Sequence, residues 1–154
     1  MTTTETLRET REALVREHME SENRHEFDVT IATFEHPRYE LIASGEVFDG
    51  QEEVAEYFAR TRGAFPDQRN EIISMRHADD AVIVELNLLG THLGELYGIP
   101  ATGLSFSCRM LAMFLFEDDR LVCERVYFNV ATIMSQLGLF GGAQAATPAP
   151  DLSP

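Results

Sequence analysis

The sequence predicts one α+β domain, in which helices come first and a long antiparallel sheet follows. Two apolar runs, residues 81–89 and 104–116, flank a Gly-rich loop, and each is too long and too rich in Val, Ile, Leu, Phe and Met to be surface coil. Helical spacing of apolar residues is confined to the N-terminal part and to a short segment after the last strand. This segregation of helix and strand patterns is typical of the α+β class.

The N-terminal part predicts three helices and a short hairpin. Two pairs, Asn23 with Glu26 and Asp49 with Glu52, resemble helix N-terminal caps. Pro37 forces the preceding residue out of the helical region and so ends the second helix. The predicted elements are a helix over residues 4–22, a shorter helix that follows the Asn23 cap and ends near residue 35, strands over 38–43 and 46–48, and a helix over about 50–62.

The C-terminal part predicts a four-stranded meander and a final helix. Along residues 81–92 apolar side chains alternate with polar ones, so the sheet has an apolar face, which the helices must cover, and a wetter face. A domain over residues 4–138 is predicted to precede a disordered tail, 139–154, which is rich in Ala, Pro and Gly. The predicted strands are 69–77, 81–92, 104–117 and 120–128, and the final helix begins at residue 130.

Charge and composition narrow the classes of partner. The net charge of −14 repels phosphate-rich partners, so no nucleic acid is expected. No apolar run approaches the length of a membrane span, and the N-terminus lacks a signal-peptide pattern. The sequence therefore predicts a soluble, cytoplasmic protein with no membrane partner.

The two cysteines are predicted to be free thiols. If Asp118 and Asp119 form the hairpin loop, Cys123 lies opposite Phe114 and Cys108 lies opposite Asn129, too far apart to form a disulfide. Their spacing does not match a metal site, so no metal is predicted.

Three segments in the same order resemble the SnoaL-like polyketide cyclases of the nuclear transport factor 2-like superfamily. They are GTHLGELYGIPATG at residues 90–103, AFPD at 64–67, and DRLVCERVYFN at 119–129 leading to QLG at 136–138. The resemblance covers roughly residues 5–138. It implies a cone-shaped fold, with a curved antiparallel sheet on about three N-terminal helices and a short C-terminal helix. It also implies a homodimer or higher homo-oligomer, a hydrophobic small-molecule ligand and no cofactor.

Two residues are the catalytic candidates. In the cyclases a carboxylate at the end of the last strand is the general acid and base, and the matching residue here is Asn129. An amide cannot exchange that proton, so Asn129 is either an amide donor in the pocket or the N-cap of the helix that begins at Val130. His92 continues the apolar face to the rim of the sheet and titrates near cellular pH, but it could equally be a hydrogen-bonded structural residue.

The ligand-binding candidates come from several elements. With the two-residue loop at 118–119, Arg125 and Tyr127 face inward beside Asn129, although a slip of one residue would invert this face. An inward Arg125 needs a carboxylate such as Glu40 or Glu85, or belongs to an ion pair at a subunit interface. The other candidates are Tyr39, which could instead be a polar strand start at the surface, and the apolar side chains Phe58, Phe106 and Met110.

The resemblance therefore implies cofactor-free acid/base chemistry on a hydrophobic carbonyl compound such as a polyketide. The implied reaction is cyclisation by intramolecular aldol condensation, or isomerisation, and we expect His92 to be the proton-transfer group and Tyr39, Tyr127 and Asn129 to be hydrogen-bond donors. The alternatives are a non-catalytic ligand-binding or dimerisation module, and an epoxide hydrolase-like relative, which requires an Asp-Arg-Asp arrangement. Apolar residues that cannot all face one core predict a homodimer contact on the wetter face: Leu111, Met113, Leu115, Val126 and Phe128.

Overall fold

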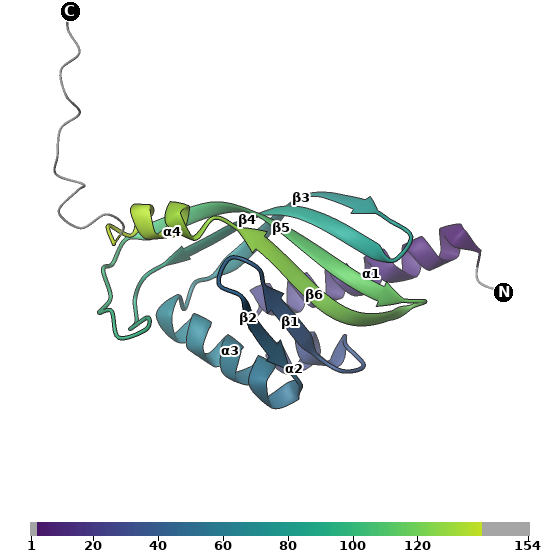
Figure 1. Ribbon diagram of the computed structural model, residues 1–154, viewed down its shortest axis with the longest axis horizontal. Coiled ribbons are helices and arrows are strands. Elements are labelled where there is room, and N and C mark those ends of the chain that lie inside the picture. Colours follow the sequence, from purple (N-terminus) through teal and green to yellow (C-terminus); the bar gives the residue numbers. More distant parts are fainter. Residues whose placement is uncertain (1–2, 140–154) are drawn as a thin grey trace, which may run out of the picture.

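The computed structural model describes residues 3–139 and shows helices packed against a curved sheet (Figure 1). Of the predicted tail, residues 140–154 lie outside the described residues. No helix within residues 3–139 is long and apolar enough to cross a membrane. The elements in order are α1 (Thr4–Asn23), α2 (Phe27–Ala32), β1 (Arg38–Leu41), β2 (Glu46–Asp49), α3 (Gln51–Ala64), β3 (Arg69–His77), β4 (Ala81–Thr91), β5 (Ser105–Glu117), β6 (Arg120–Phe128) and α4 (Val130–Gln136).

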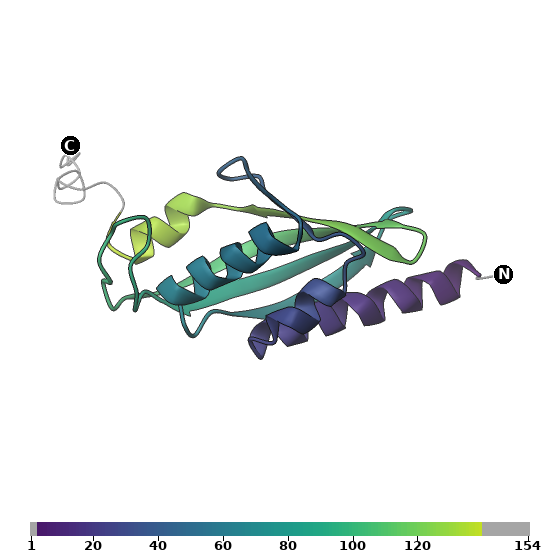
Figure 2. The same cartoon turned by 90° about the horizontal axis from the view of Figure 1, so that it is seen from below.

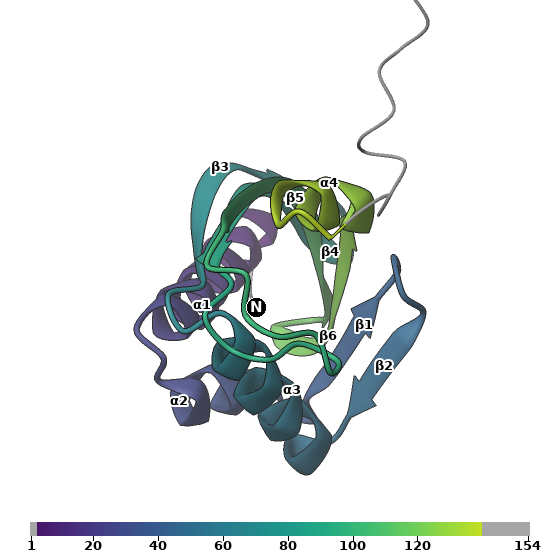
Figure 3. The same ribbon diagram turned by 90° about the vertical axis from the view of Figure 1, so that its left-hand side faces the viewer.

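The strands form one six-stranded sheet in the order β2-β1-β6-β5-β4-β3. β1 pairs with β6 in parallel, and the other neighbours are antiparallel. The sheet curves around its inner face, where α1, α2 and α3 lie, and α4 crosses one end (Figures 2 and 3). The α+β class and the cone-shaped arrangement are thus confirmed, and the alternation predicted for β4 holds, because Val82, Val84 and Leu86 are buried on the inner face.

The two predicted helix caps are wrong, and for Asn23 the reason is a tertiary contact. Asn23 ends α1 instead of capping α2: its amide donates to the backbone oxygen of Asn70 at 2.9 Å and accepts from the backbone N–H of Asn70 at 2.8 Å. The N-cap of α2 is Glu26 and that of α3 is Gly50, neither with a side-chain cap. A side chain that resembles a local cap therefore ties α1 to β3.

A β-bulge changes the predicted register between β5 and β6. The loop at 118–119 is as predicted, because Glu117 pairs with Arg120 and Phe116 with Leu121. The register then shifts by one residue, and Cys123 pairs with Leu115 rather than with Phe114, so the predicted register is wrong beyond this point. The shift turns Glu124 to the inner face. Both cysteines are free, as predicted, and the structure shows both of them buried.

The same bulge moves the other predicted inward residues of β6. Arg125 pairs with Met113 and Tyr127 with Leu111, so both lie on the outer face of the sheet, whereas the predicted register turns both inward. Val126, which was predicted to lie on the wetter face, is instead buried in the core. Phe128 likewise packs against core residues.

Candidate functional site

A cavity between the helices and the inner face of the sheet has two adjoining parts. The inner chamber, of about 40 Å³, lies among α1, α3 and the sheet, and the outer chamber, of about 280 Å³, continues toward α4 and the Gly-rich loop. Tyr57, Gln68, Leu88 and Met110 line both chambers, which therefore adjoin. Polar side chains concentrate in the inner chamber, namely Glu22, Tyr39, Tyr57, Arg62, Gln68, Arg69, Asn70 and Glu124.

A buried triad of ionisable side chains forms one wall of the inner chamber. Nε2 of His18, on α1, lies 2.9 Å from Oε2 of Glu124 and 2.7 Å from the phenol oxygen of Tyr39. Glu124 and Tyr39 line the chamber, whereas His18 contacts both of them but does not itself line the chamber. The His18 ring is fully buried, with the rings of Phe34 and Phe114 packed edge-on against it. The triad thus joins α1, β1 and β6 at the inner chamber.

The environment of the triad sets its protonation. Burial lowers the pKa of His18, but the charge of Glu124 and its hydrogen bond more than offset this, so the pKa of His18 lies above its ordinary value. Burial, reinforced by the charge of Glu124, raises the pKa of Tyr39 well above its ordinary value. Tyr39 therefore keeps its phenolic proton and can donate a hydrogen bond at any physiological pH.

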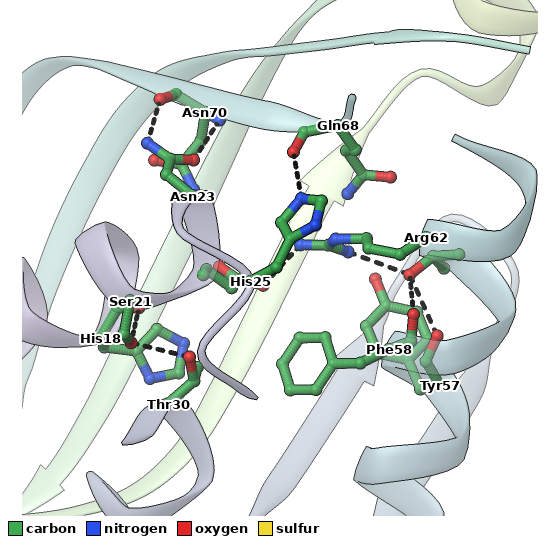
Figure 4. A network of polar contacts seen from close by, with 12 residues as sticks. His18, Ser21, Asn23, His25, Thr30, Tyr57, Phe58, Arg62, Gln68 and Asn70 are labelled. Carbon is green, nitrogen blue, oxygen red and sulfur yellow. Dashed lines mark hydrogen bonds and ion pairs between the residues drawn. The ribbon is translucent and has the colours of Figure 1, made fainter. Parts of the chain in front are cut away.

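A second ionisable pair lines the same chamber. Arg62 reaches from α3 toward α1 (Figure 4). Its Nη2 lies 3.3 Å from Oε1 of Glu22, and its Nη1 donates to Oγ1 of Thr61. The guanidinium stacks on the rings of Phe27 and Phe58. Burial and the charge of Glu124 raise the pKa of Glu22, against the effect of Arg62. Glu22 is therefore easier to protonate than an ordinary carboxyl group.

The structure brings some of the predicted ligand-binding residues to the cavity. Tyr39 is fully enclosed rather than at a surface strand start, and it lines the inner chamber. Met110 lines both chambers and Phe106 lines the outer one. Phe58 belongs to the core and packs edge-on against Tyr39.

The remaining two ligand-binding candidates face away from the cavity. Tyr127 is 39% exposed on the outer face of the sheet. Arg125 donates to Oε2 of Glu40 at 2.7 Å, which is one of the carboxylate partners that the sequence predicts for it. Both placements follow from the bulge in β6.

Neither catalytic candidate lines the two chambers. Oδ1 of Asn129 accepts from the backbone N–H of Ala131 at 3.0 Å, so Asn129 is the N-cap of α4. His92 is fully buried beside Phe65, and its Nδ1 accepts from the backbone N–H of Thr102 at 3.3 Å. This geometry favours the structural role for His92, which closes the Gly-rich loop on itself.

We expect His92→Gln to lower the free energy of unfolding by about 1–3 kcal/mol, because the hydrogen bond that the buried His92 ring makes to the loop is lost or poorly replaced. Turnover per folded molecule should stay within about twofold of the wild type, since His92 lines neither chamber. Thermal unfolding and activity measured on the same sample check this. A well-folded variant with a large loss of turnover would return His92 to the mechanism.

The main ionisable residues of the chamber are ones that the sequence does not single out. His18 and Glu22 lie four residues apart on α1, and His18 shares the apolar face of that helix, which is the one available sequence signal. Glu124 lies inside the segment that resembles the cyclases, but the predicted register turns it outward. Arg62 resembles any charged residue near a helix C-terminus.

The family model for SnoaL-like polyketide cyclases matches residues 12–137. The chain therefore belongs to this family. None of the curated proteins compared with the chain matches it significantly.

Solved structures with the same fold include three distant relatives. IdmH from Streptomyces antibioticus, for which polyketide cyclase activity has been suggested, is 23% identical over 82% of this chain and 97% of its own, with a TM-score of 0.70. AclR from Streptomyces galilaeus, a suggested hydroxylase, is 22% identical over 85% of this chain and 82% of its own, with a TM-score of 0.73. A protein with a ketosteroid isomerase-like fold from Catenulispora acidiphila, solved with trimethylamine, is 18% identical over 88% of this chain and 97% of its own, with a TM-score of 0.71. At these identities the likeness shows the fold alone.

Proposed function

We propose that the protein is an enzyme that catalyses cofactor-free proton transfer at the carbon next to a carbonyl group of a neutral, hydrophobic small molecule such as a polyketide. The observation that carries this proposal is the placement of a carboxylate, Glu124, and a protonated phenol, Tyr39, side by side in the polar inner chamber, which adjoins the more apolar outer chamber. A general base and a hydrogen-bond donor at one point are what enolisation requires.

The residues suggest a simple course for the reaction. Oε2 of Glu124 is bonded to His18, so Oε1 takes the proton from the α-carbon as the C–H bond breaks. The electron pair moves to the carbonyl oxygen, where the hydroxyl of Tyr39 donates to the developing enolate. The enolate carbon then attacks a second carbonyl in a cyclisation, or takes the proton back at another carbon in an isomerisation.

The charges of the cavity favour a neutral substrate. Each buried carboxylate of the inner chamber already has a cationic or titratable partner, His18 for Glu124 and Arg62 for Glu22. An anionic ligand would meet the two carboxylates, and a cationic ligand would meet Arg62. In either case these groups are already paired, so none of them offers the ligand an unpaired opposite charge. Apolar side chains of the outer chamber, including Leu96, Ile99 and Phe106, would hold the hydrophobic body of the substrate.

Hydrogen–deuterium exchange tests this function without knowledge of the natural substrate. The protein is incubated in deuterated buffer with neutral ketones of increasing size, such as 2-nonanone and acetophenone, and loss of the α-hydrogen signal is followed by NMR. We expect saturable exchange above the rate in buffer alone. Ketones that raise the melting temperature but exchange no faster than in buffer would instead support the non-catalytic ligand-binding alternative.

A second candidate function, epoxide hydrolysis, is favoured by one observation. Arg62 and two carboxyl groups, Glu22 and Glu124, line the same small chamber, a set related to the carboxylate-arginine-carboxylate arrangement that such hydrolases require. Glu124 would activate water and a protonated Glu22 would protonate the epoxide oxygen as its C–O bond breaks. Formation of a diol from a neutral cyclic epoxide, with one oxygen from ¹⁸O-labelled water, would identify this activity.

We also propose that the outer face of the sheet forms a homodimer contact. Leu111 is 37% exposed there, beside the half-buried Met113 and Leu115, and the helices cover the opposite face. Leu111→Glu should convert a dimer at micromolar concentration to a monomer, because a charge in an apolar contact is costly. Light scattering measures the mass, and Glu71→Gln on the edge strand β3 is the control. A wild-type monomer would contradict the proposal.

A further inference from the structure

Thr33 contacts the ring nitrogen of His18 that Glu124 and Tyr39 do not contact. Oγ1 of Thr33 lies 2.8 Å from Nδ1 of His18, and its hydroxyl donates to the backbone oxygen of Thr30 at 2.6 Å. A hydroxyl group carries one proton, and in Thr33 that proton is already used. Oγ1 of Thr33 must therefore accept from His18, which means that Nδ1 of His18 carries a hydrogen.

The surroundings hold this arrangement in place. Thr30 is fully buried, and its Oγ1 lies 2.7 Å from Oγ of Ser21, which in turn donates to the backbone oxygen of His18 at 2.8 Å. Figure 4 shows His18, Ser21 and Thr30 gathered where α1 and α2 meet. The contact with Thr33 on one side and the packed rings of Phe34 and Phe114 on the others hold the His18 ring in one orientation.

We propose that Thr33 is a positioning residue that keeps Nδ1 of His18 protonated, so that Nε2 is the one ring nitrogen that shares a proton with Glu124 and Tyr39. This inference rests on the proposed function of that triad. With a hydrogen held on Nδ1, the neighbouring side chains of Glu124 and His18 share a single further proton between Oε2 and Nε2. In the imidazolium–carboxylate form the site is neutral overall before it meets the substrate.

The proton balance of the reaction follows from this state. When Glu124 takes the α-proton, the imidazolium of His18 remains, and its positive charge offsets the negative charge of the enolate. When the proton returns to carbon, the site regains its first state with no proton taken from solvent. Without the Thr33 acceptor, the ring could place its hydrogen on Nε2 alone, as a neutral imidazole, and this balance would be lost.

The groups that face the His18 ring come from four elements. Glu124 on β6 and Tyr39 on β1 meet Nε2, Glu22 on α1 adds a negative charge nearby, and the C-cap residue of α2 is Thr33. Of these, Thr33 is the one group that meets Nδ1 among the described residues. Its removal should therefore change the tautomer of His18 while leaving the charges around the ring in place.

Nitrogen NMR of the histidine ring tests the proposal on the whole protein without any substrate. In ¹⁵N-labelled wild type, Nδ1 of His18 should show the shift of a protonated nitrogen throughout a pH series from 5 to 9. In Thr33→Val, which keeps the shape but loses the acceptor, the neutral ring should carry its hydrogen on Nε2, and the pKa of His18 should fall by about one unit. Thr33→Ser should restore the wild-type pattern.

Thr30→Val is the matched control, because it removes a buried hydroxyl from the same network but keeps the backbone oxygen that Thr33 needs. A merely structural role for Thr33 predicts that both Val variants lose stability and neither changes the tautomer. A Thr33→Val ring that keeps Nδ1 protonated, or a wild-type ring with an unprotonated Nδ1, would overturn the proposal. Because the NMR readout needs no turnover, its failure is distinct from a failure of the ketone exchange assay.

Discussion

Glu124→Gln is expected to reduce α-hydrogen exchange by about 10²–10⁴-fold, the usual contribution of a positioned general base. The amide keeps the size of the side chain and can still bond to His18, but it cannot take a proton from carbon. Ketone binding, followed by the shift in melting temperature, should be largely kept. Exchange by NMR in deuterated buffer measures the effect.

Glu40→Gln is the control for this substitution. Glu40 is also a strand carboxylate, but it pairs with Arg125 on the outer side and lines neither chamber. Its removal should leave exchange within about twofold of the wild type. Equal exchange in wild type and Glu124→Gln would remove Glu124 as the base.

Glu124→Gln should also change how the free energy of unfolding depends on pH. The pKa of His18 is raised in the folded protein, so its contribution to stability is fully present below its ordinary value of about 6.5 and is lost as the pH rises through the raised value. In Glu124→Gln the charge that raises this pKa is absent. Urea unfolding from pH 6 upward should therefore show a smaller loss of stability in the variant than in the wild type.

The sequence was sufficient to predict the faces of β4 because its polar side chains, Glu85, Asn87 and Thr91, all fall on one face of the strand. Val82, Val84 and Leu86 all occupy the predicted inner face, and β5 follows with Phe106 and Met110 at the cavity. Strand periodicity carries this information as long as each residue has one partner across the ladder.

The candidate site was much harder to predict, because one extra residue in β6 reverses its pattern. The bulge near Val122 places the adjacent residues Cys123 and Glu124 both in buried positions, which no strict alternation produces. His18 was visible as a polar residue on an apolar helix face, but its partners lie about 20 and 100 residues away, at Tyr39 and Glu124. Such contacts depend on the tertiary fold rather than on local spacing.

Gly94→Ala is expected to have the largest effect on stability among single substitutions in the Gly-rich loop. A Cβ atom at this position would lie 2.0 Å from the backbone oxygen of Gly63, which is far inside van der Waals contact. The loop is held there because the backbone N–H groups of Leu93 and Gly94 both donate to the oxygen of Ala64, at 3.0 and 3.1 Å. A methyl group must therefore push the loop away from the end of α3.

Displacement of the loop should also open the outer chamber. Leu96, Tyr97 and Ile99 line that chamber, and the hydroxyl of Tyr97, a residue that is 66% exposed, donates to Glu46 on β2 at 3.1 Å. If the strain and the lost hydrogen bonds cost on the order of 3 kcal/mol, the melting temperature should fall by about 10 °C for a chain of this size. Ketone binding should weaken as well, because the loop supplies part of the apolar wall.

Gly63→Ala provides the control from the other side of the same contact. A Cβ atom at Gly63 meets nothing within 4 Å, and the residue lies inside α3, where Ala favours the helix by about 1 kcal/mol. Calorimetry should therefore show a small rise in melting temperature for Gly63→Ala and a large fall for Gly94→Ala. If Gly94→Ala has the same melting temperature as the wild type, the loop can leave α3 at little cost in free energy. The loop would then be a movable cover of the outer chamber rather than a fixed wall.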